Sequence, residues 1–249
     1  MIRRLVACAA GTAALIGVAC LDMSAPRNGV ESISSVLLPS PSVVVGDTMR
    51  DSTGVVSPLG LLAYDAKGNV VTGLTSAFFV LDRGAHVTAT GQLVGDSTTA
   101  VRVVGTIGGL QTATATVPVS VSPDTVVRTS GPDSIIFKID GDSLQASGPL
   151  SIAVRNRAGI GATGFVVRFT LVSAPPTAPG TLPFAYIADA QFRAATRDTT
   201  DAGGTANRLR AVVRRASFAG TGNIVIDASV QYRGAPVHGS PVRFVIPVK

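Results

Sequence analysis

The sequence lacks tryptophan, and its 249 residues include only two cysteines, two histidines and one glutamate. Two cysteines exclude a disulfide-dense miniprotein, and the scarcity of cysteine and histidine argues against a zinc module. With a single glutamate, Glu31, hydrolysis by a pair of carboxylates would have to use aspartates. Charged residues make up only 14%, whereas hydrophobic residues reach 46%. Such a chain can bury a core, which excludes wholesale disorder.

The first 20 residues have the pattern of a signal peptide. Arg3 and Arg4 precede an uncharged stretch from Leu5 to Ala19, which is short for a bilayer span of ~20 residues but suits a signal peptide. Small residues before Cys20 resemble the lipobox of bacterial lipoproteins, in which the cysteine carries the lipid, although Gly17 stands where leucine is usual. We predict a lipoprotein-type signal peptide over residues 1–20, lipidation at Cys20 and a flexible tether over 21–29.

Two alternatives remain open for this segment: ordinary secretory cleavage near Cys20, or an uncleaved anchor helix. In the lipoprotein interpretation the chain is exported to the cell envelope and held at the outer membrane or cell surface by a lipid anchor, so the membrane is its first partner. Because Cys8 lies inside the leader, the mature protein would keep at most one cysteine and no internal disulfide. The exported part must then rest on its core alone.

Beyond residue 40, apolar residues alternate with a period of two, and turn residues recur about every ten positions. In the C-terminal strand, for example, Val242, Phe244, Ile246 and Val248 would all face one way. The pattern predicts an all-β chain of two tandem antiparallel sandwiches, over residues 30–121 and 122–249. The predicted strands of the second block are 134–139, 150–155, 166–172, 184–188, 206–213, 224–231 and 242–248.

Three segments of the first block resemble the group 2 bacterial Ig-like domains. These are Val-Val-Val-Gly-Asp-Thr at 43–48, Ala-Tyr-Asp-Ala-Lys-Gly-Asn-Val-Val at 63–71 and Ala-Thr-Gly-Gln-Leu-Val at 89–94, with a closing Thr-Ala strand at 112–117. The tryptophan usual in that family is absent, and Phe78 or Phe79 stands in its region.

The second block is similar to the invasin-type (group 1) bacterial Ig-like domains. The segments that carry this similarity are 154–159 (Val-Arg-Asn-Arg-Ala-Gly), 166–169 (Val-Val-Arg-Phe) and 200–206 (Thr-Asp-Ala-Gly-Gly-Thr-Ala). The proline-rich insert at 175–183 departs from the family. Together the two resemblances imply a tandem Ig-like surface protein, a fold that hosts many functions and assigns none by itself.

The sequence offers no catalytic group and implies no cofactor. His86 and His238 fall in different blocks, and neither stands in a Gly-x-Ser-x-Gly elbow or another nucleophile motif. Asp140 and Asp142 could supply part of a calcium site, but Ca²⁺ needs six to eight oxygens and no second acidic cluster accompanies them. We therefore expect neither an active site nor a metal site.

The two blocks differ in net charge. Residues 30–121 hold four basic and six acidic side chains, whereas residues 122–249 hold fourteen basic and eight acidic ones, a net charge of +6. Arg208, Arg210 and Arg214 share a parity and are predicted on one strand face, with Arg215 at the start of the next turn. Guanidinium groups in a row suit carboxylate, sulfate or phosphate, although a solvated sheet face also needs polar residues.

Two functions follow as hypotheses. The first is a non-enzymatic envelope lipoprotein whose Ig-like modules serve adhesion or act as a surface spacer, with a surface protein or polysaccharide as partner. The alternative is a glycan- or polyanion-binding module that uses Arg208, Arg210, Arg214 and Arg215. Nucleic acid is not expected as a partner, because aromatic residues for base stacking are sparse near these arginines.

Overall fold

The computed structural model describes residues 29–131 and 134–249. These residues form strands, turns and the short 3-10 helix η2 (Arg215–Ser217). Within this part of the chain, no helix has the length and apolar character needed to cross a bilayer. The predicted leader, Cys20 and nearly all of the predicted tether lie outside the described residues.

The first sandwich contains three sheets. The largest has the strand order β2-β10-β8-β5, and β9 also pairs with β8. The two smaller sheets are β1-β3-β4 and β6-β7. Its pairings are antiparallel except for β2 and β10, which run parallel. The strands are β1 (Ser32–Ile33), β2 (Val43–Val44), β3 (Ala63–Tyr64), β4 (Val70–Val71), β5 (Ser76–Val80), β6 (Ala85–Val87), β7 (Leu93–Gly95), β8 (Ala100–Ile107), β9 (Leu110–Gln111) and β10 (Ala115–Ser120).

The second sandwich packs the sheets β11-β13-β17 and β12-β18-β15 against a sheet in the order β16-β14-β19-β20, in which β21 also pairs with β19. All of its strand pairings are antiparallel. The strands are β11 (Thr125–Ser130), β12 (Leu144–Ala146), β13 (Ser151–Arg155), β14 (Val166–Ser173), β15 (Ala185–Ala188), β16 (Arg197–Thr199), β17 (Thr205–Ala206), β18 (Arg210–Arg214), β19 (Gly222–Tyr232), β20 (Ala235–Pro236) and β21 (Val242–Val248).

This architecture confirms the predicted all-β class with tandem antiparallel sandwiches. The period-two pattern explains why: along β19, Ile224 and Ile226 are fully buried while Asp227 between its apolar neighbours faces outward. The larger core belongs to the second sandwich and is centred on Phe169, Phe184 and Phe244. The first sandwich has a smaller core, centred on the valines of β8 and β10.

Two predicted strands differ from the structure. The segment predicted as one strand at 206–213 is divided between β17, which ends at Ala206, and β18, which begins at Arg210. Ser134–Ile139 is not a strand, and only Ile135 makes an isolated bridge, to Val248. The strand of this region is β11 (Thr125–Ser130), which pairs with β13. The apolar run at 135–137 does not alternate with polar residues, and Ile136 remains 70% exposed, so the run cannot bury one face against a sheet.

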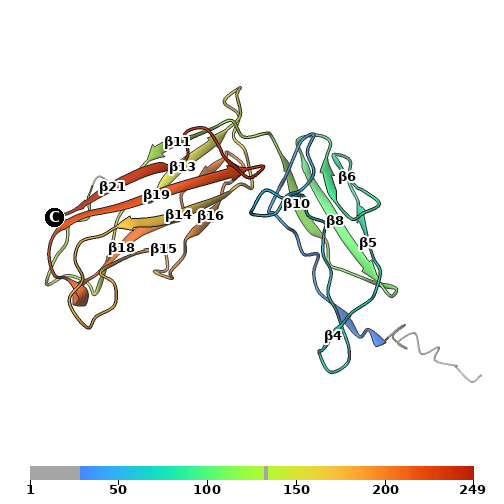
Figure 1. Cartoon of the computed structure of the whole chain (residues 1–249), viewed down its shortest axis with the longest axis horizontal. Coiled ribbons are helices and arrows are strands. Elements are labelled where there is room, and N and C mark those ends of the chain that lie inside the picture. The colour runs from blue at the N-terminus through green and yellow to red at the C-terminus, as the bar shows by residue number, and fades with distance from the viewer. Residues whose placement is uncertain (1–28, 132–133) are drawn as a thin grey trace, which may run out of the picture.

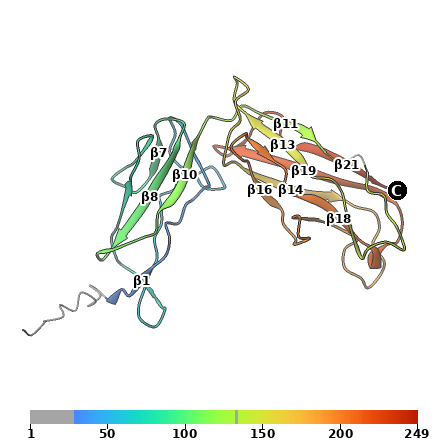
Figure 2. The same cartoon turned by 180° about the vertical axis from the view of Figure 1, so that it is seen from behind.

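The two sandwiches meet end to end at an angle (Figure 1). The view from behind shows the same bend, with β10 leading from the first sandwich toward β11 in the second (Figure 2). Only four residues separate the end of β10 at Ser120 from the start of β11 at Thr125. So short a connection keeps the ends of the sandwiches in contact, and this contact is where the most elaborate polar cluster of the described residues lies.

Candidate functional site

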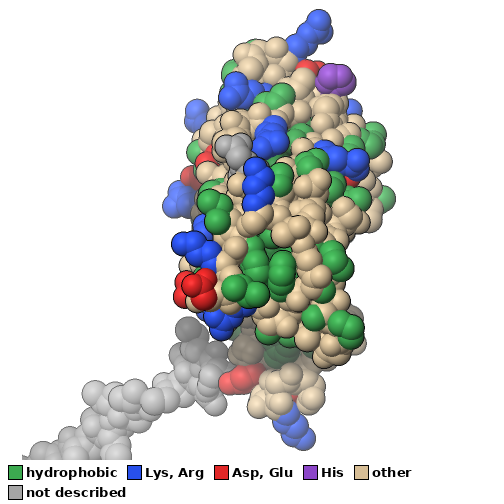
Figure 3. Space-filling view, turned by 90° about the vertical axis from the view of Figure 1, so that its left-hand side faces the viewer, with side chains coloured by type: hydrophobic (Ala, Val, Ile, Leu, Met, Phe, Trp, Pro, Cys, Tyr) green, Lys and Arg blue, Asp and Glu red, His purple; other side chains and the backbone are tan. Residues whose placement is uncertain are grey.

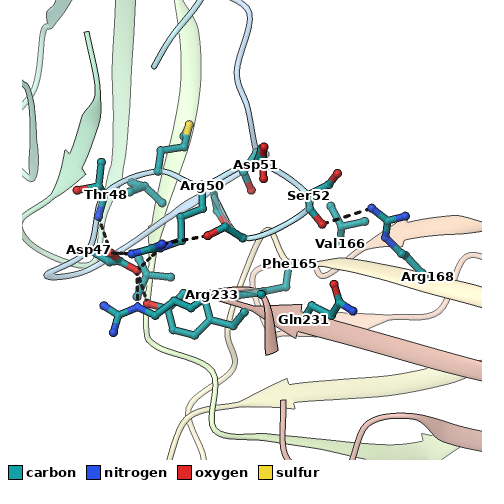
Figure 4. Close-up of a pocket in the computed structure, with 18 of the residues that line it drawn as sticks. Asp47, Thr48, Arg50, Asp51, Ser52, Phe165, Val166, Arg168, Gln231 and Arg233 are labelled. Carbon is teal, nitrogen blue, oxygen red and sulfur yellow. Dashed lines mark hydrogen bonds and ion pairs between the residues drawn. The ribbon is translucent and has the colours of Figure 1, made fainter. Parts of the chain in front are cut away.

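Asp47 joins the two sandwiches. It follows β2 in the first sandwich, and its side chain is only 7% exposed. From the second sandwich, the Tyr232 hydroxyl donates to Asp47 Oδ2 at 2.7 Å and Arg233 Nε donates to the same oxygen at 2.9 Å. Arg50 approaches from the first sandwich, with its Nε 3.0 Å from Oδ2 (Figure 4). One buried carboxylate therefore binds three side chains that come from both domains.

The pKa of Asp47 reflects this environment. Burial raises the pKa of the carboxyl group, but hydrogen bonds from Arg50, Arg233, Tyr232 and the Thr48 backbone N–H outweigh burial and hold it well below its usual range. Asp47 is thus a carboxylate throughout the physiological range. Burial first, and then the neighbouring carboxylate, raise the pKa of the Tyr232 hydroxyl, which stays protonated and donates its hydrogen bond.

The local chain conformation places these groups. Asp47 also accepts the backbone N–H of Thr48 at 2.8 Å, which fixes its rotamer at the end of β2. Arg50 reaches past Asp47 and donates from Nη1 to the Gly54 carbonyl at 3.0 Å, so it ties the 51–54 turn to the cluster. Arg233 lies in the β19–β20 hairpin, where its positive φ of 51° turns the chain toward the first sandwich.

Other contacts extend the joint around Asp47. The Ser42 hydroxyl donates to the carbonyl of Gly164 in the second sandwich at 3.1 Å, and both residues are buried. Val44 of β2 packs into the core cluster of the second sandwich. The close approach of Gly54 and Gly234 matters most sterically, because a Cβ at Gly54 would lie 2.0 Å from the Gly234 nitrogen.

The joint encloses a cleft of about 80 Å³, lined by residues of both domains including Asp47, Phe165 and Arg233. Ligand pockets for small molecules usually measure ~300–1,000 Å³. The cleft is therefore smaller than such pockets. Its polar groups also bind each other, which is the chemistry of a structural joint.

The structure does not place the four predicted arginines, at 208, 210, 214 and 215, on one strand face. β18 begins at Arg210, so Arg208 lies outside the strand and binds the buried carboxylate of Asp198, with Nε 2.6 Å from Oδ1. Arg208 therefore neutralises an internal charge. Arg215 begins η2 and donates to the Gly141 carbonyl.

Arg210 and Arg214 lie on the same face of β18. The Arg214 guanidinium lies 3.9 Å from the centroid of the Tyr186 ring, and its Nη1 donates to the Pro183 carbonyl. The buried Nε of Arg210 has no hydrogen-bond partner among the described residues. Figure 3 shows the end of the second sandwich, where Lys and Arg side chains are spread among apolar ones. Two of the four predicted arginines thus remain together on one face of β18, where both are half-buried and Val212 between them is fully buried.

The other predicted chemistry-bearing groups stay apart. His86 forms an exposed pair with Asp96 in the first sandwich, while His238 is exposed in the second. Nowhere in residues 29–131 and 134–249 do three His, Cys, Asp or Glu side chains gather as metal ligands. Sequence reasoning missed the roles of Asp47, Tyr232 and Arg233, because the partners lie 185 and 186 positions apart and share no motif.

The chain matches no protein-family model, and no curated protein is similar to it in sequence. Solved structures that resemble it include surface-layer protein SbsC, domains 1–6, at 15% identity and a TM-score of 0.34, covering 88% of this chain and 28% of that one. The adhesin InvE of Yersinia pseudotuberculosis has 18% identity and a TM-score of 0.35, covering 89% and 60%. Invasin, a bacterial integrin-binding protein, has 15% identity and a TM-score of 0.30, covering 87% and 39%.

This chain therefore spans less than two thirds of the length of each of these structures. They are a surface-layer protein, an adhesin and an integrin-binding protein. Identities and TM-scores this low carry no argument about function, and the fold assignment rests on the strands and sheets themselves.

Proposed function

We propose that this chain is an exported, non-enzymatic surface protein whose two Ig-like sandwiches form a stiff elbow that serves adhesion or acts as a spacer. The main observation in support is the joint, in which a buried carboxylate of one domain binds a tyrosine and an arginine of the other. An interface with buried hydrogen bonds, an apolar contact and a close backbone approach resists bending. A fixed angle is useful where a binding surface must be held away from its anchor.

Replacing Gly54 with alanine tests the stiff elbow. Its φ of +88° disfavours any side chain, and the new Cβ would meet the backbone of Gly234, which cannot move without shifting the second sandwich. We expect small-angle X-ray scattering to show a wider spread of inter-domain angles and a larger maximum dimension. Gly68→Ala is the matched control, because Gly68 has a φ of +80° and nothing within 4 Å. If the two variants scatter alike, the elbow is not held by this contact.

The lipid anchor is the second part of the proposal. Its support is the sequence pattern that ends at Cys20, after an apolar run of signal-peptide length. We expect Cys20→Ala to move the protein from the membrane fraction to the soluble fraction of a bacterial host, because one diacyl or triacyl group provides most of the membrane affinity. Unchanged membrane partition would remove lipidation from the proposal.

A polyanion-binding surface is a second candidate function. It is favoured by the position of Arg210 and Arg214 on one face of β18. Arg208 contributes little, because Asp198 occupies it. Binding of an acidic or sulfated polymer here would weaken with salt, which screens exposed charges beyond ~8–10 Å.

A further inference from the structure

The strand β5 (Ser76–Val80) forms one edge of the largest sheet of the first sandwich. It is the last strand in the order β2-β10-β8-β5, and within the described part of the chain it pairs only with β8. The next strand, β6, crosses to another sheet and pairs with β7. Figure 1 draws β5 on the side of the first sandwich that is turned away from the second. The outer edge of β5 is therefore a place where another chain could pair.

The main chain of β5 has unpaired groups along this edge. Gly105 of β8 lies opposite Phe78, and its N–H and C=O both bind Thr112, on the side away from β5. Phe78 and Gly105 are thus a non-hydrogen-bonded pair, and by alternation Ser76, Phe78 and Val80 all direct their main-chain groups outward. None of these outward N–H and C=O groups has a hydrogen-bond partner among the residues that the structure describes.

The other long edge strands of the described sheets carry features that block pairing. β11 contains Arg128, β21 contains Arg243 and Pro247, and the outer side of β15 is covered by residues 193–195. β5 has none of these features, because residues 73–81 include neither a charge nor a proline, and the pairing with β8 has no bulge. A regular, uncharged edge strand is the kind to which a further strand adds.

The side chains of β5 are complementary to those of a second β5. Phe79 is 52% exposed on the outer face, and Ala77 is exposed on the same face. If two β5 strands pair antiparallel about a two-fold axis at Phe78, Phe79 of each copy lies directly opposite Ala77 of the other. A large ring opposite a small side chain covers it without a clash. One register therefore satisfies both copies.

Charge does not oppose this pairing. Residues 30–121 hold four basic and six acidic side chains, so two first sandwiches repel each other less than two second sandwiches with a net charge of +6 would. Asp82, the first charged residue after β5, lies opposite the uncharged Leu74 in this register and is bound by Arg102 at 2.8 Å. No charged residue of one strand faces a like charge of the other.

We propose that two copies of this chain associate through their β5 strands, which pair antiparallel about Phe78 and join the largest sheets of two first sandwiches into one. Ser76 of each copy exchanges main-chain hydrogen bonds with Val80 of the other, and the two copies of Phe78 exchange theirs with each other. The Phe79 rings cover Ala77 on the outer face. This association depends neither on the stiffness of the elbow nor on the lipid anchor, so it is tested separately from both.

Sedimentation velocity of the full chain over a range of concentrations tests the association. We expect a monomer–dimer equilibrium, and Phe79→Glu should raise its dissociation constant at least about tenfold, because each dimer contains the contact with Ala77 twice. Val70→Glu is the matched control. Val70 is 50% exposed in the same sandwich but lies outside β5, so this change should alter the constant less than about threefold. All variants keep residues 1–28 unchanged, so any contribution of that segment is common to them.

Two outcomes of this experiment overturn the proposal. The first is a wild-type chain that stays monomeric at every concentration, which would leave the edge of β5 without a second copy. The second is a dimer that Phe79→Glu and Val70→Glu weaken equally, which would place the contact elsewhere on the molecule.

The double variant Ala77→Lys/Phe79→Glu tests the register. In the proposed pairing the lysine of each copy lies opposite the glutamate of the other, and opposite charges in this position stabilise a strand pair. Ala77→Lys alone should weaken the dimer, and the double variant should associate more tightly than either single variant. Such a rescue also shows that the substituted chains fold. Failure of the double variant to restore association contradicts the pairing about Phe78.

Hydrogen exchange of single amides, followed by NMR, gives a second measurement. The Phe78 and Val80 amides should exchange more slowly as the protein concentration rises, because only the dimer protects them. The Phe79 amide faces β8 by the same alternation that places the Leu81 N–H on the Arg102 carbonyl, so its exchange should not depend on concentration. If the Phe78 and Val80 amides show no dependence on concentration in a sample that dimerises, the dimer does not form through β5.

Discussion

Asp47→Ala is expected to lower the free energy of unfolding by about 2–3 kcal/mol and to release the angle between the sandwiches. Breaking a buried ion pair costs ~3–5 kcal/mol when the remaining charge stays buried. Here the partners Arg50 and Arg233 are 26% and 54% exposed, so water compensates part of the loss. Chemical denaturation measures the stability, and small-angle scattering measures the change in angle.

Asp82→Ala is the matched control for this experiment. Asp82 also binds an arginine of its own domain, Arg102, but at a more exposed position and without contact to the second sandwich. Its loss should lower the stability much less than the loss of Asp47 does and should leave the elbow unchanged. If Asp47→Ala and Asp82→Ala change the stability and the inter-domain angle equally, Asp47 contributes no more than a surface ion pair does, and the joint does not depend on it.

The contribution of Asp47 also has a definite pH dependence. Its folded pKa lies below the unfolded value of ~3.9, so the stabilisation is fully present above that value and is lost as pH falls through the folded pKa. The stability difference between the wild-type protein and Asp47→Ala should stay constant from about pH 5 to pH 8. It should shrink below about pH 4, which identifies the carboxylate as its source.

The elements that could be predicted from the sequence are those with a local pattern. β19 and β21 carry an apolar residue at every second position from Ile224 to Val230 and from Val242 to Val248, so the sequence alone predicts which face of each strand is buried. β11 has buried Val126 but four exposed residues after it, and it is a strand because β13 lies beside it. Its pairing is a tertiary effect that overrides local preference.

The joint could not be predicted for a related reason. Asp47 stands in a Gly-Asp-Thr segment that is typical of a turn, and nothing near it in sequence distinguishes it from Asp65, a turn aspartate bound only by its own loop. What distinguishes Asp47 is its contact with Tyr232, which lies at the β19–β20 hairpin, 185 positions later in the sequence. The arginine row was partly predictable, because the parity of Arg210 and Arg214 on β18 is local, whereas the distance from Arg208 to Asp198 depends on how β16 folds back.

The Thr-Asp-Ala-Gly-Gly-Thr-Ala segment that resembles invasin-type domains has a physical reason for its second glycine. Asp201 accepts the N–H groups of Gly203 and Thr205, which closes a turn that brings Gly204 against β13. The Gly204 carbonyl accepts the Val154 N–H. Gly204 has a φ of +76°, and a Cβ there would lie 2.5 Å from the Val154 oxygen and 2.6 Å from the Gly161 Cα. Both of these atoms belong to the backbone, which cannot move away by changing a rotamer as a side chain could.

Gly204→Ala is therefore expected to destabilise the second sandwich by at least about 3 kcal/mol, more than the left-handed conformation alone would cost. Gly159→Ala separates the two effects, because Gly159 has a φ of +80° in the Asn156 turn but nothing within 4 Å, and should cost only about 1 kcal/mol. Denaturant titration followed by NMR signals of each domain measures both losses and shows whether the first sandwich stays folded. A Gly204→Ala loss no larger than that of Gly159→Ala would mean that β13 and the 201–205 turn do not pack this closely in solution.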